Sequence, residues 1–224
     1  MHYTLQFRSI REYLPLLWDA AYTTLYLSVL AIILSVAIGC GLAIMRRSQS
    51  RFARFVAVAY IEVMRNTPLL VILYIVYFAL PAMGLRFSSF AAALIGLTLN
   101  SAGYMAEIIR AGLVAIAHGQ FEAARAQGFN PVQTYRHIIL PQVFRVIYAP
   151  LGNQVIAVIL ASSLASAVAV EDVASWMQTV GSTSFRFFET FLVAAAVYLV
   201  LCQTVNLIRL AIGWMLFRDN GARR

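Results

Sequence analysis

Residues 122–141 read EAARAQGFNPVQTYRHIILP, a polar stretch in a chain whose other long segments are apolar. The residues before Gly128 favour a short helix with small side chains on its surface, and Gly128 itself permits a turn. Asn130 and Pro131 are typical of an N-cap followed by the first position of a second helix. Pro141 is expected to end that second helix. The stretch therefore predicts two short helices joined at a glycine, and a connection this long in a compact protein is usually functional.

The composition of the chain indicates an integral membrane protein. Of its 224 residues, 62% are hydrophobic and 12% are charged, and the apolar residues gather into segments long enough to cross a bilayer. The net charge of +8 then fits basic loops beside membrane spans, and it gives no reason to expect nucleic-acid binding. All 17 basic residues counted as Lys+Arg are arginine, so a phosphate-binding loop of the GxxxxGK type is excluded and any ATP must be bound by a partner. Residues 1–11 do not resemble a cleavable signal peptide.

Five apolar segments are expected to cross the membrane as helices. The first is followed by the densest basic cluster of the chain, Arg46, Arg47, Arg51 and Arg54, which the positive-inside rule assigns to the cytoplasm. The N-terminus then lies outside and, after five spans, the basic C-terminus lies inside. The expected spans are approximately 19–45, 56–80, 90–109, 151–170 and 191–217.

These spans divide the chain into three parts. Residues 1–18 are expected to form an extracytoplasmic or interfacial segment, and residues 218–224 a basic cytoplasmic tail. Between them lies the membrane domain, 19–217, whose cytoplasmic loop is expected at about 116–148. Residues 171–190 are expected to form an outer connection.

The polar stretch resembles the "EAA" loop in the permease subunits of ATP-binding cassette importers. The resemblance rests on Glu122-Ala123-Ala124, then Gly128, then Ile139-Leu140-Pro141, all placed before the penultimate span. Other motifs resemble the branch of that family that imports polar amino acids and opines. They are YIEVMRNTPLLV at 60–71, the run from Leu99-Asn100-Ser101 through Glu107 to Arg110, LGNQ at 151–154 and SSLAS at 162–166.

This resemblance implies an all-α membrane protein of about five spans with a cytoplasmic two-helix coupling loop. It also implies a bacterial cytoplasmic (inner) membrane, a second identical or related permease subunit, two ATP-binding cassette ATPase subunits and an extracytoplasmic solute-binding protein. ATP and Mg²⁺ would be bound by the ATPase, with no cofactor in this chain and no enzyme activity of its own. The residues implied to couple to the ATPase are Phe121, Glu122, Ala123, Ala124, Gly128, Phe129 and Pro141.

Two pairs of opposite charges lie inside the expected spans. Glu62 and Arg65 are three residues apart, as are Glu107 and Arg110, so each pair can meet on one helix face. Both pairs should lie toward the cytoplasmic side, and we expect them to form one network between the second and third spans. Static pairing that fixes helix register and an inner gate that opens and closes are both compatible with this pattern.

Polar residues nearer the middle of the spans are candidates for a solute path. Such side chains can also hold membrane helices together without touching solute. Many amino-acid permeases carry a Lys-Asp pair immediately before the two serines of the SSLAS motif, whereas this chain has Leu160 and Ala161 there, which leaves the identity of the solute open. The candidates are Asn100, Gln154, Ser162 and Ser163.

Three other classes of membrane protein fit the sequence less well. An ion-coupled secondary transporter usually carries an internal repeat, and none is evident here. A membrane enzyme would need a catalytic cluster, but His2, His118 and His137 are far apart in sequence and no HExxH motif occurs. A purely structural membrane subunit would not explain a dedicated two-helix loop.

Overall fold

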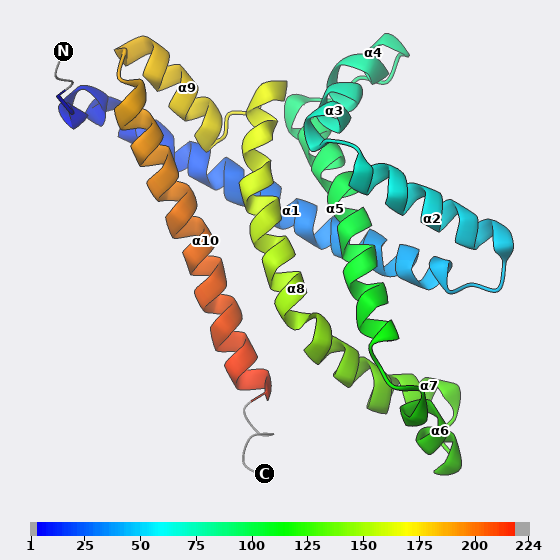
Figure 1. Cartoon of the computed structure of the whole chain (residues 1–224). Helices are drawn as coiled ribbons and strands as arrows, with labels where there is room; N and C mark the ends of the chain where they lie inside the picture. Colours follow the sequence, from blue (N-terminus) through cyan, green and yellow to red (C-terminus); the bar gives the residue numbers. More distant parts are fainter. Residues whose placement is uncertain (1–3, 218–224) are drawn as a thin grey trace.

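The computed structural model describes residues 4–217, and every regular element within them is helical. The predicted all-α fold is therefore confirmed (Figure 1). The predicted tail, 218–224, lies outside the described residues. The α-helices are α1 (Leu14–Arg46), α2 (Arg51–Asn66), α3 (Leu69–Tyr74), α4 (Leu80–Ala82), α5 (Ser89–Val114), α6 (His118–Ala126), α7 (Pro131–Thr134), α8 (Leu140–Ala161), α9 (Val173–Ser184) and α10 (Phe187–Phe217). Two 3-10 segments, Phe7–Tyr13 and Ser162–Val168, and two π-helical turns, Ile75–Ala79 and Tyr135–Ile139, complete the order.

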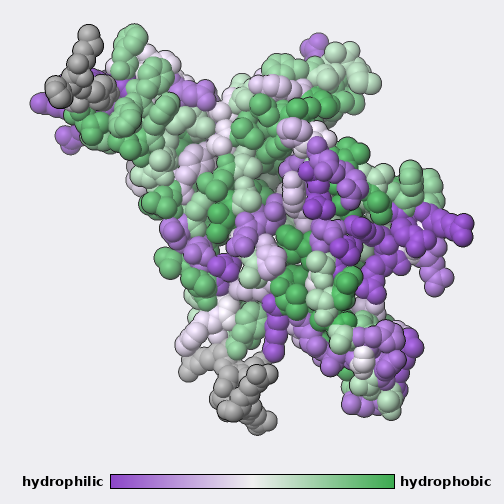
Figure 2. Space-filling model, in the orientation of Figure 1, coloured by the Kyte–Doolittle hydropathy of each residue, from purple (hydrophilic) through white to green (hydrophobic). Residues whose placement is uncertain are grey.

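The described part of the chain holds about five membrane spans, as predicted. Four helical segments are long and apolar enough to cross a bilayer, and a fifth span results if α2 and the helix that follows it are counted as one bent pair. In Figure 2, hydrophilic residues gather at the end that carries α6 and α7 and at the neighbouring α1–α2 corner. The four segments are Phe7–Arg46, Ser89–Val114, Pro131–Val168 and Phe187–Phe217.

The core lies where α1 crosses α5. Leu27 of α1, Leu97 of α5 and Val158 of α8 are buried in one apolar cluster. A Cβ atom added to Gly39 of α1 would lie 2.6 Å from the Cβ of Met105 on α5, so only glycine allows the two backbones to approach this closely. The close crossing fixes α5 against α1, and α5 in turn carries most of the polar groups discussed below.

The expected second span, 56–80, is not one continuous helix. The segments Arg51–Asn66 and Leu69–Ala82 are bent by 105° relative to one another. Pro68 causes the break, because it cannot donate a backbone hydrogen bond and it disfavours helical backbone in the preceding residue, Thr67, which is extended (φ −102°, ψ 129°).

The bend is stabilised by hydrogen bonds from polar side chains to backbone carbonyl groups, for which lipid tails offer no substitute. The carbonyl oxygens of four consecutive residues at the end of α2 each accept a hydrogen bond from a side chain. Backbone groups freed inside a membrane must be satisfied in this way. The four bonds run from Asn66 Nδ2 to Glu62 O (2.8 Å), Thr67 Oγ1 to Val63 O (2.7 Å), Asn100 Nδ2 to Met64 O (2.8 Å) and Tyr104 Oη to Arg65 O (3.2 Å).

Pro141 does not end the second helix of the polar stretch, contrary to the prediction. Helix continues from Pro131 to Val168 as one segment, and the π-helical turn Tyr135–Ile139 comes just before the proline. The wider π turn accommodates a residue that lacks a backbone N–H. Pro81 is likewise preceded by a π-helical turn, Ile75–Ala79.

The expected outer connection, 171–190, contains a helix of its own. Asp172 starts α9 as N-cap, accepting a hydrogen bond from the backbone N–H of Ser175 at 2.8 Å. The backbone N–H of Val173 donates to Thr24 Oγ1 of α1 at 3.1 Å, which ties the start of α9 to the first span. In Figure 1, α9 lies at the opposite end of the molecule from α6 and α7.

Candidate functional site

The two short helices predicted from residues 122–141 are present as α6 and α7, which we call the knob (residues 118–134). Gly128 joins them with φ of +79°, a left-handed conformation that glycine adopts without a steric penalty. Asn130 Oδ1 accepts from the backbone N–H of Gln133 at 2.9 Å, and Gln133 Oε1 accepts from the backbone N–H of Asn130 at 3.0 Å. This capping box and Pro131 in the first turn confirm the predicted helix start.

Only part of the knob is available to another molecule. Ala123 is exposed on α6, as is Glu122, whose carboxylate lies 3.1 Å from His118 Nδ1. Ala124 is 1% exposed and packs inside this chain. Of the two small residues predicted to meet a partner, the structure therefore leaves Ala123 alone on the surface.

Aromatic and aliphatic side chains attach the knob to two membrane helices. Phe121 is half-buried, and its ring meets that of Tyr135 edge-on with centroids 6.0 Å apart. Phe121 also packs on an apolar cluster built around Ile139 and Val143, with Leu113 of α5 beside it. This cluster joins α5 to α8, so the knob packs on both helices. Phe129 is half-buried as well.

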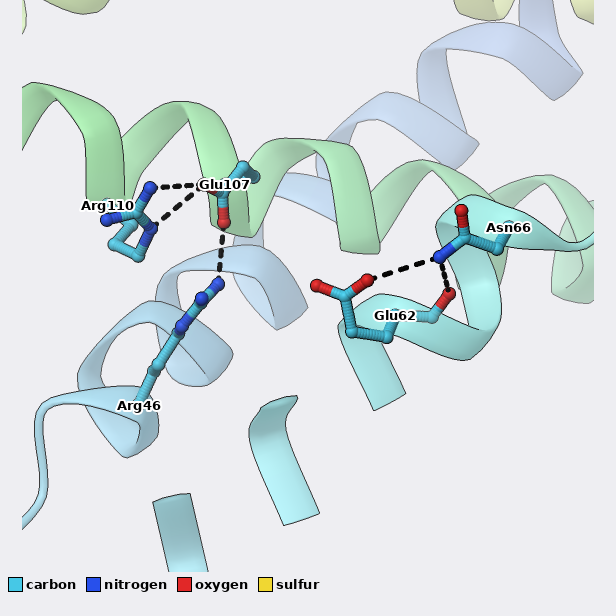
Figure 3. Close-up of polar contacts among 5 residues, drawn as sticks. All are labelled: Arg46, Glu62, Asn66, Glu107 and Arg110. Atoms are coloured by element: carbon cyan, nitrogen blue, oxygen red, sulfur yellow. Dashed lines mark hydrogen bonds and ion pairs between the residues drawn. The ribbon is translucent and has the colours of Figure 1, made fainter. Parts of the chain in front are cut away.

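The predicted charge network forms only in part. The Glu107 carboxylate forms an ion pair with Arg110, three residues further along α5. Arg110 Nε donates a hydrogen bond to Glu107 Oε1 at 2.9 Å. The other carboxylate oxygen of Glu107 accepts a hydrogen bond from Arg46 Nη1, at the end of α1, at 2.6 Å. Figure 3 shows Glu62 apart from this group, with its carboxylate bonded to Asn66 at 3.2 Å. The network therefore links α1 to α5, and the predicted bond between Glu62 and Arg65 is not formed.

Arg65 lies instead against α5. Its guanidinium carbon is 5.6 Å from the centre of the Tyr104 ring, a cation–π contact. Its Nε is buried and has no hydrogen-bond partner within residues 4–217. The group therefore retains a donor for an acceptor that the described chain does not supply.

A groove lined by four polar and five apolar residues lies between α5 and α8 beside the α2–α3 bend. It measures about 240 Å³, and two predicted residues, Asn100 and Gln154, line it together with Ser101 and Tyr104. Gln154 Nε2 donates to Ser101 Oγ at 3.4 Å across the groove. A second hollow adjoins it, sharing Asn100 and Tyr104 and adding Arg65.

The hydroxyl groups of the two serines predicted for the solute path donate hydrogen bonds to backbone carbonyls of their own helical segment. Ser162 is fully buried, and its hydroxyl donates to Ile159 O at 2.7 Å. The Ser163 hydroxyl donates to Leu160 O at 2.7 Å. Both belong to the 3-10 segment that follows α8 and neither lines the groove.

Sequence reasoning missed three residues of these sites. Arg46 was assigned to the basic loop, although its position at the end of the first span could have placed it beside Glu107. Tyr104 lies four residues after Asn100 and three after Ser101, so its side chain shares a helix face with each of them.

The fold and the knob together define a class: a multi-span membrane permease with a two-helix loop at one end. The chain matches the family described as "Binding-protein-dependent transport system inner membrane component" over residues 31–213. The chain belongs to this family, and it is a multi-pass inner-membrane component of such a transport system. The predicted fold and family are confirmed.

Individual proteins similar to this chain include permease proteins of amino-acid and opine transporters. The chain is 39% identical over 183 residues to the probable glutamine ABC transporter permease protein GlnM of Bacillus subtilis (strain 168), covering 82% of this chain and 85% of that protein. It is 34% identical over 218 residues to the nopaline transport system permease protein NocM of Agrobacterium fabrum, covering 92% and 90%. The fold matches a chain from a crystal structure of an amino acid ABC transporter with histidines, with a TM-score of 0.88, 35% identity and coverage of 94% and 98%.

Proposed function

We propose that this chain is the membrane-spanning permease subunit of an ATP-driven importer and moves a polar amino acid or an opine-type solute by alternating access. The amino-acid and opine class is supported by relatives whose names specify glutamine and nopaline permeases. The observation that carries the mechanism is the knob, whose two helices are capped, turned at Gly128 and packed on both α5 and α8.

A separate ATPase subunit would bind the exposed side of α6. The surface there is formed by Glu122 and Ala123, and a small residue such as Ala123 allows a partner backbone to approach closely. ATP and Mg²⁺ would be held by that partner. In the full importer, two ATPase subunits would bind two permease subunits, and a solute-binding protein would deliver solute at the end that carries α9. The N-terminus would then lie outside and the C-terminus inside.

The solute would pass along the groove between α5 and α8. Its amide and hydroxyl groups, from Asn100, Ser101 and Gln154, can donate to a carboxylate and accept from an ammonium group. Arg65 in the adjoining hollow has an unpartnered Nε, so it can bind the carboxylate that every amino acid and opine carries. Because Arg65 also lies at the α2–α3 bend, solute binding and the bend would be coupled.

Reconstituted uptake tests this function. The chain, its ATPase and its solute-binding protein are placed in proteoliposomes, and uptake of labelled glutamine, histidine, cystine and nopaline is measured with ATP supplied on the ATPase side. We expect uptake of at least one of these solutes that requires both ATP and the binding protein. Uptake driven by an ion gradient without ATP would favour the ion-coupled secondary transporter, and no uptake of any solute would favour a structural subunit.

A further inference from the structure

A cationic pocket lies at the joint between the knob and the membrane helices. It measures about 370 Å³ and is lined on one side by Arg46 and Arg47 from the end of α1, by Arg110 of α5 and by His118 of α6. The end of α1 and the consecutive helices α5 and α6, which are distant from α1 in sequence, thus bring their basic groups to one hollow. The proposed solute path does not use this pocket, because the groove for solute lies elsewhere between α5 and α8.

The charges around the pocket do not cancel. Glu107 is bonded to both Arg46 and Arg110, so one carboxylate is shared by two guanidinium groups. Adding Arg47, three arginine charges less one carboxylate charge leave two positive charges. Glu122, whose carboxylate lies 3.1 Å from His118, adds one negative charge beside the pocket, so an excess of at least one positive charge remains. The pocket therefore favours an anion.

The guanidinium groups also retain hydrogen-bond donors. Each guanidinium has five N–H groups. Arg46 bonds Glu107 through Nη1, and Arg110 does so through Nε and Nη2, so each has further N–H groups to offer. Glu107 fixes both side chains in place, and their exposed fractions are only 25% and 32%. Two half-buried guanidinium groups held side by side suit a phosphate, whose oxygens accept several such bonds.

The rest of the lining is apolar. Leu113, Val114, Ile116 and Phe121 complete the pocket. The pocket also lies where two membrane spans end, since the span of α1 ends at Arg46 and that of α5 at Val114. An anion bound there would have its charged part against arginine and its remainder against hydrocarbon, which is the structure of a phospholipid at the bilayer boundary.

We propose that this pocket binds a phosphate group, and that the phosphate is carried by the headgroup of an anionic phospholipid. The bound lipid would brace the knob against the ends of α1 and α5. Because Phe121 lines the pocket and also packs in the cluster that attaches the knob to α8, the lipid would act on the same contacts that transmit movement of the knob.

Thermal unfolding of the purified full-length chain in nanodiscs tests the proposal. Phosphatidylglycerol is titrated into phosphatidylcholine nanodiscs, and the melting temperature is expected to rise with its mole fraction. Arg47→Gln removes one pocket charge but leaves the bonds of Glu107 intact. We expect it to raise the phosphatidylglycerol fraction needed for half of the rise about tenfold, as for the loss of one charge-assisted hydrogen bond to the phosphate.

Two controls separate a pocket from general attraction to anionic lipid. Arg54→Gln makes the same charge change at an exposed position of the same basic cluster, outside the pocket, and should leave the titration unchanged. Equal effects of the two variants, or no response to phosphatidylglycerol, would overturn the proposal. In pure phosphatidylcholine nanodiscs, millimolar inorganic phosphate should give no comparable rise. If it did, and if Arg47→Gln alone abolished that rise, the phosphate site would stand and its assignment to a lipid would be wrong.

Discussion

Asp172 is a buried carboxyl group between the last two membrane spans. Its side chain has no exposed surface, and Oδ2 has no hydrogen-bond partner within residues 4–217. Burial raises the pKa of Asp172 from 3.8 to about 6, although the backbone N–H of Ser175, which favours the charged form, opposes the shift. The folded protein therefore holds this proton more tightly than the unfolded chain does.

The sign of the resulting pH dependence follows from linkage. Since the folded pKa lies above the unfolded one, the contribution of Asp172 to stability is greatest below pH 3.8 and is lost as the pH rises through about 6. Asp172→Asn keeps an N-cap residue of the same shape but cannot ionise. We expect it to be more stable than the parent at pH 7.5, by up to about 3 kcal/mol, and similar to it near pH 4.

The measurement is the melting temperature of parent and variant in detergent between pH 4 and 8. Glu171→Gln, at the exposed neighbouring position, is the control and should leave the difference between pH 4 and pH 7.5 as it is in the parent. A constant offset between Asp172→Asn and the parent at every pH would contradict the account.

Local features could be predicted where they depend only on residues that are adjacent in sequence. Gly128 and the Asn130–Pro131 start needed only the preferences of those residues, and the structure has both as expected. Ala124 and Glu62 could not be placed in this way, because burial of the first and the Asn66 bond of the second depend on the packing and the bend of the folded chain.

At the scale of elements, Gly39 is the residue at which the backbones of α1 and α5 approach too closely for any side chain. Gly39→Ala would place its Cβ 2.6 Å from the Cβ of Met105 and 3.0 Å from the backbone nitrogen of Ala106, neither of which can move aside cheaply. We expect the substitution to lower the free energy of unfolding by about 1–3 kcal/mol, measured by denaturant titration in mixed micelles.

Gly41 provides a matched control two residues along the same helix. An added Cβ there meets no other atom within 4 Å, so Gly41→Ala should be neutral or stabilising by up to about 1 kcal/mol. Equal destabilisation by both substitutions would show that loss of glycine as such, rather than the α1–α5 contact, is responsible.

The number of membrane spans could be predicted, but not their bends. Apolar length alone identified five spans, and the structure contains them if the bent pair is counted once. Two of the mispredicted details involve proline. Pro68 bends the second span by 105°, whereas at Pro141 the helix continues after a π-helical turn. Which of these occurs depends on partners such as Asn100 and Tyr104, which lie far from the bend in sequence.

At the scale of the whole molecule, the two ends carry different structural features. The end with α6 and α7 carries the knob, the charge network around Glu107 and the cationic pocket, and the other end carries α9 (Figure 1). The groove lies between α5 and α8, the two helices on which the knob packs. Movement of the knob can therefore change the shape of the groove through helices that contact both.

Ala123→Trp tests this coupling most directly. Ala123 is exposed on α6, so a large side chain there should leave the melting temperature of the chain unchanged while it prevents close contact with the ATPase. Ala195→Trp, at an exposed position on α10, is the matched control. We expect Ala123→Trp to reduce ATP-driven uptake in proteoliposomes by about tenfold or more and Ala195→Trp to leave it intact. Full ATP-driven uptake by the Ala123→Trp transporter would contradict the assignment of the knob as the coupling element.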